Sequence, residues 1–193
     1  IVTTLNHPII RQAIAATADD LSGVNRLSKL KNLVEETAKA ANKIANYTDT
    51  ASSSTPTAAG LVPSVEDFEA IFVDDVDSTN IAALRDALAD DDVSVGSGLT
   101  ADIQSVVDSY NKVLHLADAT DNVLENGASA AAGFEAASVK PAATDYTNLG
   151  VSLNADASIE AAQVALMGDV IDLKSASHVD TVAEIQAIAD AVV

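Results

Sequence analysis

The chain has 193 residues, with ten lysines and arginines against 29 aspartates and glutamates, and it contains no cysteine. A formal charge of -19 disfavours nucleic acid and anionic lipid surfaces as partners. The absence of cysteine excludes disulfides and thiolate metal sites. No apolar run reaches the length of a membrane span, so we predict no membrane insertion.

Charge is distributed unevenly along the chain. The first 50 residues hold six basic and five acidic residues, whereas the rest of the chain holds four basic and 24 acidic ones. This pattern is typical of a solvated acidic surface, or of a near-neutral head that docks on an acidic body. The sequence starts without methionine and stops within an expected helix, which favours a processed product or a fragment.

The near-neutral head contains a long amphipathic helix. Its apolar residues recur at spacings of three and four, as on one face of a helix. They are Leu27, Leu30, Leu33, Val34, Thr37, Ala38, Ala41 and Ile44. A Ser/Thr-rich linker is expected at 48–56, since it ends in a proline.

Three helices are predicted in the middle of the chain, near 64–72, 79–89 and 100–118. Ser64 and Thr100 are expected to cap the first and third of these at their N-termini. Near the C-terminus, Thr181 and Glu184 have the spacing of a capping box. The core of the short helices is predicted to consist of Phe68, Phe72, Tyr146 and Leu149.

The chain resembles itself at two offsets. Pro63–Phe68 aligns with Pro141–Tyr146 at an offset of 78 residues, and Ala101–Asp108 aligns with Ala183–Asp190 at 82. In the head, Asn42-Lys43-Ile44 recurs as Asn111-Lys112-Val113. Such periods are typical of repeat architectures, whose units bury their apolar faces against one another.

We therefore predict an all-α fold of tandem three-helix repeat units, packed into an elongated helical bundle. The expected domains are a divergent, truncated unit at 1–55 and two repeat units at 56–123 and 124–193. A second linker is expected at 126–133, where glycine, alanine and serine dominate.

Two eight-residue segments resemble a known group of proteins. They are Thr144-Asp145-Tyr146-Thr147-Asn148-Leu149-Gly150-Val151 and Asp180-Thr181-Val182-Ala183-Glu184-Ile185-Gln186-Ala187. Together they are similar to a short helical repeat of very large bacterial secreted, adhesin-like surface proteins. The resemblance covers residues 60–193 well and 1–55 poorly, and it departs at Phe72, where the later copy has Gly150. It implies an extracellular or cell-surface location and a structural or adhesive role.

Two acidic loops are candidate calcium sites, because calcium prefers clusters of hard oxygen ligands. The first contains Asp74, Asp75 and Asp77, and the second contains Asp90, Asp91 and Asp92. The first loop lacks the glycine and distal glutamate of an EF-hand, and an acidic first helical turn explains it equally well. Calcium is the one cofactor considered.

Catalysis is not expected. The three histidines, His7, His115 and His178, have no partner at metal-ligand spacing, and no nucleophile elbow or phosphate-binding loop occurs. The principal hypothesis is a non-catalytic structural or adhesion module, whose partners are copies of itself or adjacent repeats. A calcium-binding module is one alternative.

A second alternative is a self-assembling subunit of a surface layer or filament, joined head-to-tail through its ends. Seven apolar residues near the two termini would make that contact. They are Ile1, Val2, Leu5, Ile9, Ile10, Val192 and Val193.

Overall fold

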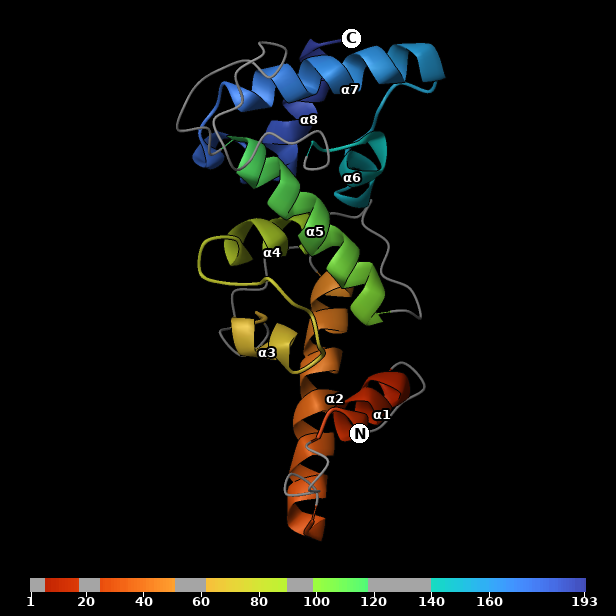
Figure 1. The fold of residues 1–193 in the computed structure, drawn as a ribbon, viewed down its shortest axis with the longest axis vertical. Coiled ribbons are helices and arrows are strands. Elements are labelled where there is room, and N and C mark those ends of the chain that lie inside the picture. Colours follow the sequence, from red (N-terminus) through yellow and green to blue (C-terminus); the bar gives the residue numbers. More distant parts are fainter. Residues whose placement is uncertain (1–5, 18–24, 51–61, 90–98, 118–139) are drawn as a thin grey trace. The chain divides into compact units, whose positions relative to one another are not determined.

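The computed structural model describes residues 6–17, 25–50, 62–89, 99–117 and 140–193. In these ranges it contains eight α-helices, one short 3-10 helix and no strand, so the all-α prediction is confirmed for the described residues (Figure 1). The helices are α1 (His7–Ala15), α2 (Leu27–Thr50), α3 (Val65–Glu69), α4 (Ile81–Ala89), α5 (Leu99–Ala117), α6 (Ala143–Asn148), α7 (Ala157–Asp172) and α8 (Val182–Ala191), with the 3-10 turn η1 (Ala176–His178) before α8.

The predicted helices of the middle region agree with α3, α4 and α5 to within a few residues. The linker predicted at 48–56 is wrong in its first part, because α2 continues through Thr50. Tyr47 is only 7% exposed, so packing holds the helix to that point and one further turn follows. The remainder of this linker and the one at 126–133 lie outside the described residues.

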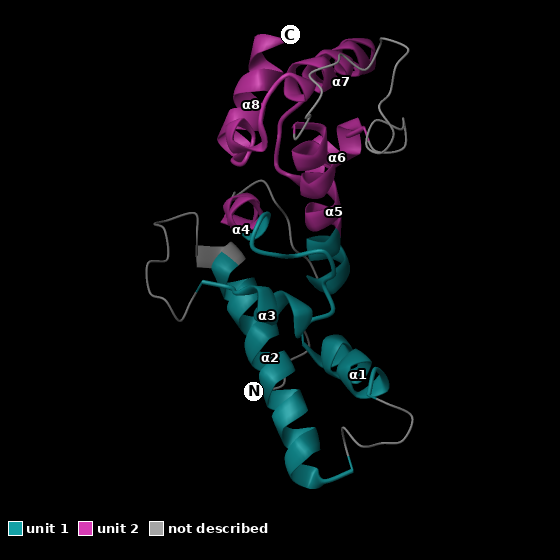
Figure 2. Cartoon of the chain, turned by 60° about the vertical axis from the view of Figure 1, so that its left-hand side comes forward, with its two compact units in different colours: residues 1–81, 94–104 teal, residues 82–93, 105–193 magenta. Residues whose placement is uncertain are grey.

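The chain forms two compact units, which are described separately (Figure 2). Unit 1 comprises Ile1–Ile81 and Ser94–Gln104, and unit 2 comprises Ala82–Val93 and Ser105–Val193. In unit 1, α2 packs against α1 and α3. In unit 2, α7 packs against α6 and α8.

The predicted apolar face of α2 is buried along only part of its length. Ala38, Ala41 and Ile44 are at most 2% exposed. Leu27, at the start of the same helix, is 82% exposed. The helical spacing was therefore predicted correctly, and the structure shows that only part of this face is packed.

The short helices α3 and α6 end in the same kind of turn. In each, the N–H group of a valine reaches back five residues to a carbonyl, from Val73 to Phe68 at 3.1 Å and from Val151 to Tyr146 at 3.0 Å. This Schellman arrangement needs a residue with positive φ just before the valine. Phe72 (φ 62°) and Gly150 (φ 83°) take that position.

The turn explains why the prediction of Phe72 as a core residue is wrong. The backbone of Phe72 has the positive φ that the turn requires, and its side chain is only partly buried. Phe68, Tyr146 and Leu149 are fully buried, as predicted.

Two of the three predicted N-terminal caps are correct. Ser64 precedes α3, and its backbone N–H donates to Asp67 Oδ2 at 2.8 Å. Thr181 precedes α8, and its Oγ1 accepts from the Glu184 N–H at 3.3 Å and donates to the Glu184 carboxylate at 2.9 Å. Thr100 is not a cap, because α5 begins at Leu99 and the Thr100 hydroxyl donates to the Ile71 carbonyl at 2.9 Å.

Two tyrosines are buried in unit 2, with different surroundings for their hydroxyls. Tyr110 is 1% exposed, and its hydroxyl donates to the Val179 carbonyl at 3.2 Å. Tyr146 is 0% exposed, and among the described residues nothing pairs with its hydroxyl. Burial raises the pKa of both phenols, so both stay protonated at neutral pH.

This contrast predicts opposite effects of one substitution. Tyr146→Phe removes an unsatisfied buried hydroxyl and should raise the free energy of unfolding by about 1 kcal/mol. Tyr110→Phe removes a satisfied hydroxyl, leaves the Val179 carbonyl unpaired, and should lower it by about 1–2 kcal/mol. Urea unfolding followed by circular dichroism measures both changes in free energy. Changes of the same sign would contradict the conclusion that only the Tyr110 hydroxyl is hydrogen-bonded.

Candidate interaction site

In unit 1, the short helix α3 is attached to α2 by an ion pair. Lys43 Nζ, on α2, lies 2.5 Å from Asp67 Oδ2, and both side chains are less than one-fifth exposed. The same carboxylate oxygen accepts from the N–H and the hydroxyl of Ser64. Asp67 therefore joins the start of its own helix to the neighbouring helix.

In unit 2, the short helix α6 is attached to α5 in the same way. Lys112 Nζ, on α5, lies 2.7 Å from Asp145 Oδ1, and the Ala142 N–H donates to Asp145 Oδ2 at 2.8 Å. Ser109 adds to this contact, since its hydroxyl donates to Asp145 at 3.2 Å and accepts from the Asn148 amide at 3.1 Å.

A second contact also occurs once in each unit. In unit 1, the Gln104 side chain accepts from the Asp74 N–H at 2.8 Å and donates to the Asp74 carbonyl at 3.3 Å. In unit 2, Gln186 does the same with Ser152, at 2.8 Å and 3.3 Å. Each glutamine side chain thus pairs with both the N–H and the carbonyl of one residue in the loop after a short helix, as a neighbouring strand would in a sheet.

The ion pairs and the glutamine contacts fall on positions that the sequence matches with each other, whereas the Ser109 contacts occur in unit 2 alone among the described residues. Asp67 and Asp145, like Asp74 and Ser152, are separated by the offset of 78, and the glutamines Gln104 and Gln186 by 82. Sequence reasoning aligned these residues but did not identify them as contacts. The available signal was an aspartate three residues after each expected helix start, together with a lysine in the preceding long helix.

The ion pair in unit 1 makes stability depend on pH. Burial alone would raise the pKa of Asp67, but hydrogen bonds from Lys43 and Ser64 outweigh it, so the pKa lies below the ordinary value. A depressed pKa means that the stabilisation is complete above the unfolded-state pKa of about 3.9 and is lost as pH falls through the lower folded-state value.

We therefore expect the wild-type chain to lose more unfolding free energy between about pH 5 and pH 2 than an Asp67→Asn variant does. The whole acidic chain also loses charge repulsion in this range, and the comparison of the two proteins removes that common contribution. Urea unfolding at a series of pH values gives the two curves. Parallel curves would show that Asp67 has the same pKa in the folded and unfolded states.

The first predicted calcium loop is closed largely by its own hydrogen bonds. Asp77 Oδ1 accepts from the N–H and hydroxyl of Thr79, at 2.7 Å and 2.5 Å. The Asn80 side chain accepts from the Asp77 N–H at 2.9 Å and donates to the Asp75 carbonyl at 2.6 Å. These hydrogen bonds to Asp77 lower its pKa, and they give its carboxylate a capping role before α4.

Asp74 and Asp75 are exposed in the same loop, and Asp75 has a positive φ of 59°. The second loop, with Asp90, Asp91 and Asp92, lies outside the described residues. Within the described ranges, no three histidine or acidic side chains are grouped so that they could hold a metal ion. Calcium binding thus stays a prediction.

The apolar residues predicted to join chains end-to-end have different environments. Ile9 and Ile10 are 4% and 5% exposed on α1, which packs against α2, so this chain already covers them. Val193 is 71% exposed, and Val192 is half-buried. Ile1, Val2 and Leu5 lie outside the described residues.

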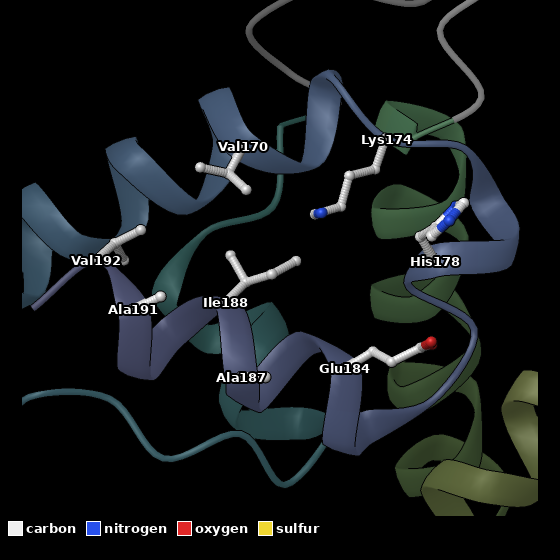
Figure 3. A pocket seen from close by; sticks show the side chains of 8 residues that line it. All are labelled: Val170, Lys174, His178, Glu184, Ala187, Ile188, Ala191 and Val192. Atoms are coloured by element: carbon white, nitrogen blue, oxygen red, sulfur yellow. The ribbon is translucent and has the colours of Figure 1, made fainter.

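Unit 2 contains a groove of about 550 Å³ between α7 and α8. Val170, Ile188, Ala191 and Val192 form its apolar lining, and the Lys174 side chain points its amino group into the space between Val170 and Ile188 (Figure 3). His178 and Glu184 lie at the other end, and the His178 ring is hydrogen-bonded to the Ser175 hydroxyl at 2.7 Å.

No family of proteins matches this chain, and neither does any curated protein or solved structure. In the parts of the chain that the structure describes, no helix is long and apolar enough to cross a membrane.

Proposed function

We propose that the chain is a non-catalytic structural or adhesion module of the cell surface or extracellular space, built from tandem helical repeats. The observation that carries this proposal is the recurrence of the lysine–aspartate contact. Lys43 with Asp67 and Lys112 with Asp145 attach a short helix to the long helix before it.

The repeat unit in this proposal is a long helix followed by a short helix, a Schellman turn and a further helix. The repeated glutamine contacts of Gln104 and Gln186 support it, because each fixes the loop after a short helix to the second helix that follows, α5 in one unit and α8 in the other. Two independent kinds of contact at matched positions are not expected of unrelated helical segments.

The proposed location rests on composition and on the resemblance of the repeat phrases to those of secreted adhesin-like proteins. A chain with no cysteine and a charge of -19 suits an exposed, highly solvated surface. Each repeat would act as a spacer or a stiffening element, since its contacts are made with its neighbours along the chain.

Labelling of intact cells tests the location. Antibodies against the chain should stain intact cells of the source organism, and protease added outside should remove the staining. A cytosolic protein in the same cells serves as the control for lysis. Staining that appears only after permeabilisation would contradict the proposal.

A further inference from the structure

Helix α7 and its C-cap residue carry an apolar stripe that the described part of unit 2 leaves about half-exposed. Ile159 and Leu166 on α7 and Leu173 at its C-cap are 44%, 49% and 53% exposed. They are seven residues apart, so they follow one face of the helix. We call these three residues the α7 stripe.

The core of unit 2 uses the neighbouring side of α7, about a quarter-turn around the helix from the stripe. Gln163, Met167 and Ile171 are at most 3% exposed there. The apolar surface of α7 is therefore wider than its buried side, and a helix that is apolar around much of its circumference is expected to be covered more widely. The described residues leave the α7 stripe about half-exposed, so it is a surface that can accept a partner.

The residue of α4 that corresponds to Leu166 is covered. By the offset of 78, Leu88 matches Leu166, and Leu88 is 0% exposed whereas Leu166 is 49% exposed. The α7 stripe is exposed whether or not the chain is a repeat protein, and only this comparison depends on the repeat proposal.

A second exposed apolar side chain lies at the beginning of α2. Leu27 is 82% exposed, and it stands between Arg26 and Lys29, which are also exposed. We call these three residues the α2 start. Its sequence from Arg26 to Asn32 contains three basic residues and no acidic one.

The two surfaces are complementary in charge. On α7, Glu160 and Asp169 are partly exposed and Asp172 is buried, and the nearest basic residue is Lys174, beside Leu173. Asp169 lies one turn before Leu173 and three residues after Leu166, so it flanks the α7 stripe on the helix surface. An apolar side chain between two cations suits an apolar stripe beside a carboxylate, since the charges are then opposite.

We propose that the α7 stripe of one chain docks on the α2 start of a second copy of this chain. The two surfaces differ, so the contact is head-to-tail, and such a contact can continue from copy to copy. It uses residues other than the terminal ones that the sequence suggested for assembly.

Cross-linking between two single-cysteine variants tests this pairing, because the chain has no cysteine of its own. Chains with Leu27→Cys and chains with Leu166→Cys are mixed and oxidised. The proposal expects a disulfide-linked dimer containing one chain of each kind, in much larger yield than from either variant alone. Ala161→Cys, an exposed alanine on another side of α7, replaces Leu166→Cys as the matched control and should give little dimer.

Light scattering behind size-exclusion chromatography supplies the second measurement. The mass of the wild-type chain should rise with concentration at moderate salt, where the repulsion between two chains of charge -19 is largely screened. Leu166→Glu should keep the chain monomeric while Ala161→Glu associates as the wild type does; circular dichroism confirms that both are folded.

Three outcomes would overturn the proposal. A constant monomer mass at all concentrations shows that the α7 stripe does not bind a second copy. Dimers formed by Leu166→Cys chains alone show that the stripe pairs with itself. Association that Leu166→Glu leaves unchanged places the contact elsewhere. None of these outcomes concerns the lysine–aspartate contacts. Failure of the docking proposal would therefore leave the proposed repeat module unaffected.

Discussion

Replacing Asp145 with alanine should lower the free energy of unfolding by about 2–3 kcal/mol, because the carboxylate is buried while its partner Lys112 is about one-third exposed. The Asp145 side chain is 8% exposed and accepts from Lys112, the Ser109 hydroxyl and the Ala142 N–H. The variant leaves all three donors without this acceptor, and water has little access to the Ser109 hydroxyl, which is 1% exposed.

Asp169→Ala is the matched control, because it removes the same charge from a partly exposed position of α7. It should change stability by no more than about 0.5 kcal/mol. Adding Lys112→Met to Asp145→Ala should recover part of the loss, since the ammonium is then no longer left unpaired. Urea unfolding measures all three variants, and a loss below about 1 kcal/mol for Asp145→Ala would show that this contact does not hold α6 in place.

Gln163→Leu is expected to lower the free energy of unfolding by about 2–3 kcal/mol. Gln163 is 3% exposed, and it links α7 to two other parts of unit 2. Its oxygen accepts from the Asn154 N–H at 2.8 Å, and its nitrogen donates to the Ala189 carbonyl at 2.9 Å. Leucine preserves most of the volume but leaves two backbone groups unpaired in a buried site.

Gln186→Leu provides the comparison for this second prediction. Gln186 makes the same kind of double contact with one backbone residue, Ser152, but its hydrogen bonds are exposed to solvent. Water can replace them, so the loss should stay below about 1 kcal/mol. Equal losses for the two glutamines would mean that burial does not set the cost. Thermal unfolding by calorimetry distinguishes the two results.

Local patterns in the sequence predicted the helices well. The three-and-four spacing identified α2 and α5, and Thr181 with Glu184 marked the start of α8. These signals are contained within one or two helical turns, so they do not depend on which other elements pack nearby.

Tertiary contacts account for the failures. Thr100 has the residue type of a cap, but its hydroxyl is used by the Ile71 carbonyl, which lies far away in sequence. Phe72 has the apolarity of a core residue, but the turn after α3 requires a positive φ at that position. Leu27 continues a correct apolar stripe beyond the part of α2 that is packed.

The sequence identified matching residues of the candidate site but not the contacts between them. Self-comparison aligned Lys43 with Lys112 and Asp67 with Asp145, yet nothing in the sequence says that a lysine contacts the aspartate 24 or 33 residues later. The α7 stripe was missed for a different reason. Its apolar residues have the spacing of a core face, and only the structure shows which part of the apolar surface of α7 is covered.

Exchange of one short helix for the other tests the central claim most directly. In this chimera, residues 142–151 are replaced by the ten residues 64–73, which keep the aspartate, the aromatic residue and the final valine in register. If the two segments are copies of one repeat element, the chimera should unfold cooperatively, with a melting temperature within a few degrees of the wild type. A scrambled version of the same ten residues should be strongly destabilised. A chimera as unstable as the scrambled control would contradict the account, because the two short helices would then be unrelated segments that share an ion pair by coincidence.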